Sequence, residues 1–101
     1  MVVTDIKIRK FFNEGPMKAV VSVTFDGALA VHDIKVINAK DKFFIVMPSR
    51  KNPDGTYRDI VHPINSDFRA ELERAVIDVY HAQYAIRDTL EYDGNDDTVI
   101  V

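Results

Sequence analysis

The sequence predicts an α+β fold, in which an antiparallel β-meander of about five strands is followed by one long C-terminal helix. Two observations lead to this prediction. Apolar and polar residues alternate with a period of two over the first sixty residues, with interruptions at Gly and Pro. From Asn65 onward, the apolar residues recur with helical spacing. One helix covers only one face of a sheet, so we expect the other face or an edge to be solvated or to pair with a second subunit.

The first two strands are predicted on either side of the turn "NEGP". In "VTDIKIRKFF", residues 3–12, Ile6 and Ile8 share one face and the charged residues share the other. In "MKAVVSVTF", residues 17–25, every second residue from Met17 to Phe25 is apolar. Asp26-Gly27 follows, and this dipeptide is typical of a tight hairpin turn with positive φ angles.

The next strands carry two irregular features. In "ALAVHDIKVIN", residues 28–38, the apolar phase shifts by one residue, which predicts a β-bulge near His32 and Asp33. The run "FFIVM", residues 43–47, is apolar on both faces, as expected of a central strand or of one covered by a second subunit. "TYRDIV", residues 56–61, is expected to pair back across the loop that contains Pro53-Asp54-Gly55.

A long helix is predicted after Pro63, with Asn65 or Ser66 as its N-cap. Its apolar stripe comprises Phe68, Leu72, Ala75, Val76, Val79 and Gln83, widened by Ile77, Tyr80 and Tyr84. Its outward face is expected to carry Arg69, Glu73, Arg74, Asp78 and His81.

The 101-residue length predicts a single domain, which we place at residues 1–88. Residues 89–101 form an acidic tail, expected to be flexible, although its four last residues could add a strand to a neighbouring edge. The chain has no Cys, which excludes disulfides and zinc–thiolate sites. No apolar run approaches the roughly 20 residues that span a bilayer, so we expect no membrane insertion and a cytoplasmic location.

Charge is distributed unevenly along the chain. Residues 1–58 hold ten Lys and Arg against six acids, a balance of +4, whereas residues 59–101 hold three against ten, a balance of −7. This split indicates a molecule with two unlike faces or ends, or an acidic helix and tail that keep the protein in solution.

No pattern in the sequence indicates an enzyme. His32, His62 and His81 lack the close spacing of metal ligands, and the carboxylates are scattered. Nucleophile-elbow, phosphate-loop and dinucleotide-binding motifs are absent from the sequence. We therefore expect no catalysis, no cofactor and no metal.

The stretch "MPSRKNPDGTYRD", residues 47–59, gathers Arg50, Lys51 and Arg58 around a Pro-Asp-Gly turn. The prolines on either side of the two adjacent cations restrict the loop, so that ordering it on a ligand costs less entropy. Such a loop could contact phosphate, which Arg holds with two hydrogen bonds and Lys attracts as a point charge. Taken alone, however, these residues favour a solvated hairpin with ordinary surface charge.

The chain closely resembles the SpoVG family of bacterial septation and sporulation proteins. The matching segments are "VTDIKIRK", "MKAVVSVTF", "AVHDIKVI" and "FIVMPSRKNPDGTYRDIVHPINSDFRAELERAV", which together span about residues 2–80. The resemblance implies a homodimer whose sheet extends across both subunits. It also implies a regulator that binds DNA, with RNA as an alternative ligand, and that acts in asymmetric septation, sporulation or gene expression.

The family's paired basic residues, which are associated with DNA binding, fall on Arg50 and Lys51. Members often have Lys-Arg-Thr here, whereas this chain has Arg-Lys-Asn, which retains the charge but moves the bidentate group by one position. We therefore expect nucleic-acid contacts first from the loop, at Arg50, Lys51, Asn52 and Arg58. A second set is expected at the start of the helix, at Asn65, Ser66 and Arg69, where Arg69 could instead form a structural salt bridge.

The resemblance leaves a second function open. The protein could be an interaction module of the septation and cell-division machinery that binds a septation-protein partner without nucleic acid. Its candidate surfaces are the acidic half of the chain and the tail.

Overall fold

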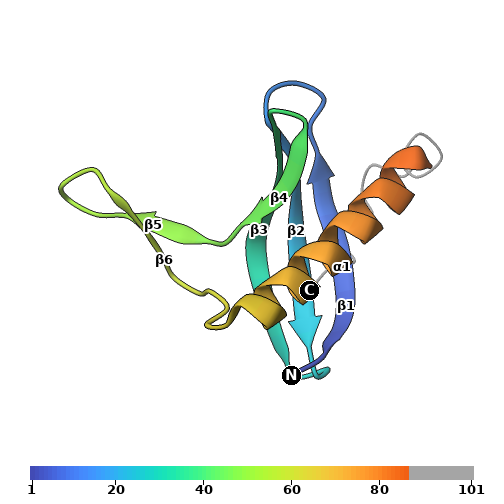
Figure 1. Cartoon of the computed structure of the whole chain (residues 1–101), viewed down its shortest axis with the longest axis horizontal. Helices are drawn as coiled ribbons and strands as arrows, with labels where there is room; N and C mark the ends of the chain where they lie inside the picture. Colours follow the sequence, from blue (N-terminus) through green and yellow to red (C-terminus); the bar gives the residue numbers. More distant parts are fainter. Residues whose placement is uncertain (87–101) are drawn as a thin grey trace.

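The computed structural model describes residues 1–86, so the expected tail at residues 89–101 and its domain boundary lie outside the described residues. Six strands precede one helix (Figure 1). In order, they are β1 (Val3–Phe11), β2 (Met17–Phe25), β3 (Leu29–Ala39), β4 (Lys42–Val46), β5 (Ser49–Lys51), β6 (Tyr57–Asp59) and α1 (Ser66–Ala85).

The predicted fold class is confirmed. Strands β1 to β4 form an antiparallel meander in the order β1-β2-β3-β4, and α1 lies across one face of this sheet (Figure 1). The strands do not form a single continuous meander, because within residues 1–86 β5 and β6 pair with each other and not with the main sheet. Ile60 and Val61 were expected in the last strand but lie beyond its end at Asp59.

The predicted hairpin turn and bulge are both present. Asp26 and Gly27 have φ angles of 55° and 61°, the positive values that a tight primed turn requires. On the β2–β3 ladder, Val21 pairs with Ile34 and Val23 pairs with Val31. Two β3 residues therefore oppose one β2 residue, which is the expected bulge at His32 and Asp33.

The core lies between the sheet and α1. Alternate residues of β2 supply its centre, and the buried helix residues fall on one stripe because they are spaced four residues apart. The buried apolar residues are Ala19, Val21, Val23, Phe25, Val31, Ile34, Val36, Ile45, Met47, Leu72, Val76 and Tyr80. Complete burial of one such aliphatic side chain stabilises the fold by about 1.5–3 kcal/mol.

Strand β4 lies at an edge of the sheet, so the expectation of a central strand is wrong for the single chain. Covering of this strand by a second subunit stays a prediction. Its edge is partly closed by α1. The Ile45 N–H donates to Glu73 Oε2 at 2.9 Å, and Arg69 Nη2 donates to the Ile45 carbonyl at 2.9 Å.

The two helix side chains thus replace, at Ile45, the hydrogen bonds of a neighbouring strand. They are 3.8 Å apart and also form an i,i+4 ion pair. The expectation that Arg69 and Glu73 face outward is therefore wrong. Both side chains reach the edge strand from the rim of the helix, and they remain 41% and 29% exposed, respectively.

Helix α1 does not have the combination of length and apolar character needed to cross a membrane.

We predict that Glu73→Ala lowers the free energy of unfolding by about 1–3 kcal/mol, because it leaves the buried Ile45 N–H without an acceptor. Urea unfolding followed by circular dichroism measures this loss. Glu71→Ala is the matched control, since Glu71 is an exposed acid on the same helix. We expect it to change stability by less than about 0.5 kcal/mol. Equal losses in the two variants would contradict the role given to Glu73.

Candidate nucleic-acid interface

Strands β5 and β6 form a two-stranded arm, residues 49–59, that projects from the main sheet (Figure 1). Its base is fixed by Met47, which is buried in the core, and by a hydrogen bond from the Ile60 N–H to the Pro48 carbonyl at 2.8 Å. The predicted pairing of residues 56–61 across the loop is confirmed for Tyr57–Asp59. The arm carries the basic stretch that the sequence singles out.

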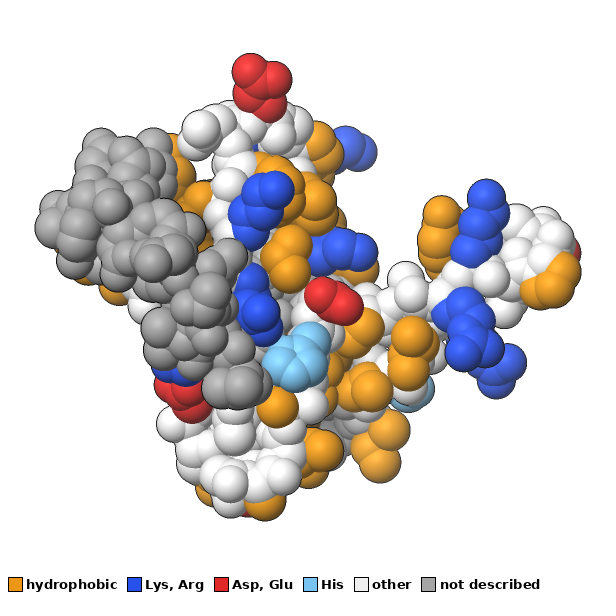
Figure 2. All heavy atoms as spheres, turned by 180° about the vertical axis from the view of Figure 1, so that it is seen from behind, with side chains coloured by type: hydrophobic (Ala, Val, Ile, Leu, Met, Phe, Trp, Pro, Cys, Tyr) orange, Lys and Arg blue, Asp and Glu red, His pale blue; other side chains and the backbone are white. Residues whose placement is uncertain are grey.

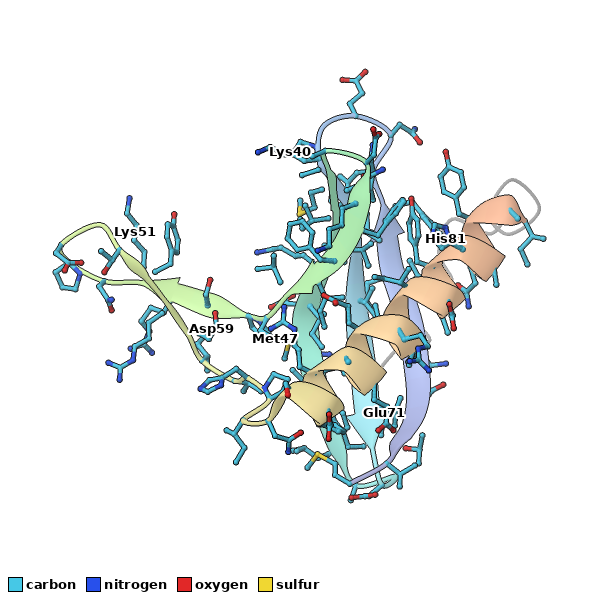
Figure 3. All side chains as sticks on the ribbon, in the orientation of Figure 1. Lys40, Met47, Lys51, Asp59, Glu71 and His81 are labelled. Atoms are coloured by element: carbon cyan, nitrogen blue, oxygen red, sulfur yellow. The ribbon has the colours of Figure 1, made fainter. Side chains whose placement is uncertain are left out.

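The ladder of the arm separates the two adjacent cations. Arg50 pairs directly with Arg58, and Lys51 pairs directly with Tyr57. Since successive strand residues point to opposite faces, the two arginines share one face and Lys51 lies on the other. Figure 3 shows Lys51 on the same side of the arm as Asp59, and Figure 2 shows Lys and Arg side chains on both sides.

The Arg50–Arg58 pair is electrostatically unfavourable when the arm is empty, because like charges directly across a ladder repel. Within residues 1–86 the ion pairs are Lys7–Asp5 and Arg69–Glu73, so neither arm arginine has a carboxylate partner there. Arg50, Asn52, Arg58, Asp59 and Ile60 line a shallow depression of about 280 Å³. Two guanidinium groups at such a site could hold a phosphate or carboxylate by paired hydrogen bonds.

The tip of the arm is ordered by its own hydrogen bonds. The Asn52 carbonyl accepts from the Gly55 N–H at 3.0 Å, and the Asn52 N–H donates to the Thr56 carbonyl at 2.7 Å. Gly55 has a φ of 94°, which favours glycine at this position. The Asn52 side-chain amide donates to Thr56 Oγ1 at 3.0 Å, so Asn52 already has a structural role in the turn.

Asp54 completes this turn. Its Oδ1 accepts from the Thr56 hydroxyl at 2.7 Å and from the Thr56 N–H at 3.0 Å. These two hydrogen bonds, the hydroxyl's first, lower the pKa of Asp54 from its ordinary value of 3.8. The arm tip is therefore organised around an ionised carboxylate at neutral pH.

The second predicted set, at the start of α1, is largely engaged within the chain. Asn65 is the N-cap, as one of the two predicted alternatives, and its side-chain oxygen accepts from the Phe68 N–H at 2.7 Å. Arg69 is bonded to the Ile45 carbonyl and paired with Glu73, which supports the structural alternative for this residue. Ser66 is exposed. The arm is thus the better candidate.

The three histidines lie in separate surroundings. His32 bonds to Ser22, His62 bonds to the Pro63 carbonyl, and the His81 ring packs edge-on against Phe43. In the part of the chain that the structure describes, no group of three or more His, Asp or Glu side chains could hold a metal ion.

Sequence reasoning found the arm cations but missed their arrangement. A five-residue loop between Lys51 and Tyr57 fixes which residues face each other, and this register is what brings Arg50 and Arg58 together. The available signal was the Pro-Asp-Gly turn, since a type I turn followed by glycine with positive φ is a common hairpin connection.

We predict that the Thr56 amide resonance shifts on acidification with a midpoint below pH 3.8. The folded pKa of Asp54 is depressed, so its contribution to the order of the arm tip is present above the ordinary pKa and is lost as the pH falls through the folded value. NMR titration measures the midpoint. Asp54→Asn should abolish the transition, and a midpoint at or above 3.8 would contradict the hydrogen-bonded turn.

Comparison with known proteins matches this chain to one family. The profile of the SpoVG family matches residues 1–82. Three relatives are each named "Putative septation protein SpoVG". The protein from Acetivibrio thermocellus is 53% identical over 94% of this chain and 99% of its own length. The protein from Caldicellulosiruptor saccharolyticus is 56% identical over 81% of this chain and 93% of its own length. The protein from Clostridium perfringens is 54% identical over 79% of this chain and 89% of its own length. The chain therefore belongs to the SpoVG family, which confirms the resemblance that its motifs indicated.

Proposed function

We propose that the protein is a homodimeric regulator that binds nucleic acid through its two arms. DNA is the first ligand and RNA the alternative. The observation that supports this most is the Arg50–Arg58 pair, which stands on a projecting arm without a carboxylate partner in residues 1–86. A polyanion would relieve the repulsion between the two guanidinium groups, because a phosphate can accept from both.

The arm also suits phosphate binding because it is exposed and ordered before binding. Arg50 and Arg58 are both exposed, and the turn bonds of Asn52 and Asp54 hold the two strands in register. Ordering such a segment on a ligand costs less entropy than ordering a free loop. Lys51 lies on the opposite face and adds a positive point charge that attracts phosphates on that side.

The proposal of a dimer has a physical basis in the arm itself. A lone two-stranded hairpin is marginally stable in water. Exposed apolar side chains lie along and beyond the arm: Tyr57 is 70% exposed, Ile60 62% and Ile64 88%. A second subunit that covers them would remove apolar surface from water and would bring a second set of arm cations onto the complex.

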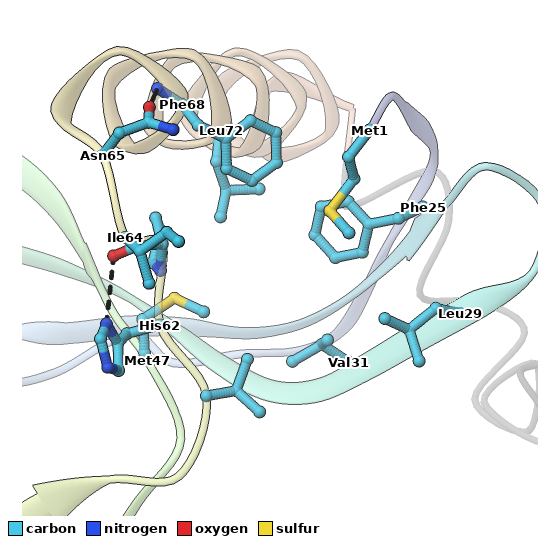
Figure 4. Close-up of a pocket in the computed structure, with 12 residues that line it drawn as sticks. Met1, Phe25, Leu29, Val31, Met47, His62, Ile64, Asn65, Phe68 and Leu72 are labelled. Carbon is cyan, nitrogen blue, oxygen red and sulfur yellow. Dashed lines mark hydrogen bonds between the residues drawn. The ribbon is translucent and has the colours of Figure 1, made fainter.

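An apolar groove beside these residues could take part in the same contact. It has a volume of about 440 Å³ and lies between the start of α1, the end of β2 and the start of β3 (Figure 4). Met47 and Leu72 form part of its wall, and the exposed Leu29 and Ile64 stand at its rim. A contiguous apolar patch of this kind is typical of a protein–protein interface.

The biological setting of the proposal comes from the relatives. They are named septation proteins, and we place the nucleic-acid binding of this chain in the control of asymmetric septation, sporulation and gene expression. The alternative is an interaction module that binds a septation-protein partner without nucleic acid.

We predict that Arg50→Ala and Arg58→Ala each weaken binding to duplex DNA and flatten its salt dependence. Each substitution removes two cations from a dimer, and each lost phosphate contact should reduce the log–log slope by roughly 0.9. Fluorescence anisotropy with a 20-base-pair DNA over a salt series measures both effects. Lys51→Ala should act on the opposite face of the arm and add to either change.

Arg74→Ala is the control, since Arg74 is an exposed arginine on α1, remote in sequence from the arm. Its salt slope should equal that of the wild-type protein. If the arm variants also keep the wild-type slope, the arm is not the nucleic-acid contact, and the septation-partner alternative is favoured.

We predict that Ile64→Asn shifts the protein from dimer toward monomer without unfolding it, because Ile64 is 88% exposed in the single chain. Sedimentation velocity over a concentration series measures the shift. Ile86→Asn is the matched control, because Ile86 is also exposed, at 51%, and lies at the other end of α1. A wild-type protein that stays monomeric at all concentrations would contradict the dimer.

A further inference from the structure

The face of the sheet opposite α1 forms a second surface with its own chemistry. On β2 the core residues alternate with Val20, Ser22 and Thr24, which therefore belong to the other face. We call this the open face, since within residues 1–86 the one helix packs on the opposite side. Figure 2 shows Lys and Arg side chains and a His gathered over it, with hydrophobic side chains between them.

A hydrogen-bonded network stands at the centre of the open face. Arg9 Nη1 donates to Ser22 Oγ at 3.3 Å, and Ser22 Oγ lies 2.8 Å from His32 Nδ1. Arginine only donates, so Ser22 Oγ is the acceptor in its bond with Arg9, whereas the donor between Ser22 and His32 depends on the imidazole tautomer. Ser22 is 7% exposed, whereas His32 is exposed.

The β-bulge is what places His32 in this network. The bulge places both His32 and Asp33 opposite Ser22, and Asp33 accommodates the extra residue with a φ of 67°. A bulge re-aims side chains in this way next to functional sites. The network thereby holds the Arg9 guanidinium and the His32 ring side by side on one stretch of the sheet.

Further cations flank the network across the strands. The register sets Lys7 beside Ser22, and it sets Lys10 and Lys35 on either side of Val20. Lys7 pairs with Asp5 at 3.6 Å, and Lys10 lies over the Phe12 ring at 5.1 Å. Asp33 is the exposed acid of the bulge itself. The balance of charge on this face is nevertheless positive.

Apolar side chains continue the same rows on β4. Lys35 pairs with Val46, and Ile37 pairs with Phe44, and all four residues are half-buried. Val36 and Ile45, between them, belong to the core, so these four lie on the open face. Cations and apolar groups, one of them aromatic, thus alternate across the surface.

We propose that the open face binds single-stranded nucleic acid. Phosphates lie against Arg9, His32 and Lys35, and bases lie against Val46 and Phe44. The inference rests on the proposed function and adds a second surface to it. A single strand fits this pattern better than a duplex, because its bases are free to contact apolar and aromatic side chains while its phosphates meet the cations.

A second copy of this chain is a poorer occupant of the open face. In a two-fold interface the same patch meets itself, so the Arg9 and Lys35 cations of one copy would face those of the other. Like charges brought together in this way cost free energy, whereas a polyanion is complementary to them.

The test compares a 20-nucleotide oligo(dT) with a 20-base-pair duplex, both by fluorescence anisotropy over a salt series. Lys35→Gln and Arg9→Gln should each reduce the log–log salt slope for oligo(dT) by roughly 0.7 per lost phosphate contact. Phe44→Leu should weaken oligo(dT) binding about fivefold or more with an unchanged slope, since it removes stacking but no charge. Duplex binding should stay at the wild-type level in all three variants.

The arm variant Arg50→Ala/Arg58→Ala separates this inference from the proposed function. If the open-face variants bind oligo(dT) as the wild-type protein does, the inference is overturned. If the arm variant then binds the duplex more weakly, the proposed function is retained. Unchanged binding of both probes by the arm variant counts against the proposed function itself. Arg9 contacts Ser22, so circular dichroism must first show that each variant is folded. If Arg9→Gln is unfolded, the conclusion is drawn from Lys35→Gln. An altered oligomeric state with unchanged binding would assign the face to a second copy and overturn the inference.

Discussion

The burial of one stripe of α1 against one face of a four-stranded sheet is the contact on which the other features of this protein depend. Leu72, Val76 and Tyr80 close the core on that side, and the same packing brings Arg69 and Glu73 to the edge of β4. One helix cannot cover two faces. Within residues 1–86, the opposite face of the sheet is therefore left with cations and half-buried apolar residues, and this constraint creates the second surface.

The arm exists because β4 cannot simply continue its ladder. Pro48 follows soon after the strand, and the chain then leaves the sheet as a separate hairpin whose base is held by the buried Met47. A hairpin that departs from the core buries little of its own surface, so its cations remain exposed. Both proposed nucleic-acid surfaces thus arise because a small α+β core buries only one face of its sheet and little of the arm.

An acidic protein can present such surfaces because its charges are segregated. The net charge is −3, yet the arm and the open face draw their cations from the first 58 residues, where the balance is positive. Acids concentrate on α1 and beyond it. At physiological salt, interactions between exposed charges fade beyond about 8 Å, so a local cationic cluster acts on a ligand largely independently of distant acids.

The sequence by itself determined the fold class, the Asp26-Gly27 turn, the bulge at His32 and Asp33, and the capped start of the helix, because these follow from local periodicity and turn chemistry. It also gathered Arg50, Lys51 and Arg58 on one short stretch of chain, which was expected to be a loop and which the structure shows as the two strands of the arm. Only the tertiary structure decided that Arg50 faces Arg58, that Arg69 donates a hydrogen bond to the Ile45 carbonyl, and that β4 is an edge strand. Each of these depends on strand register or on a contact between residues distant in the chain, and a local pattern of residue types does not specify which distant partner a side chain meets.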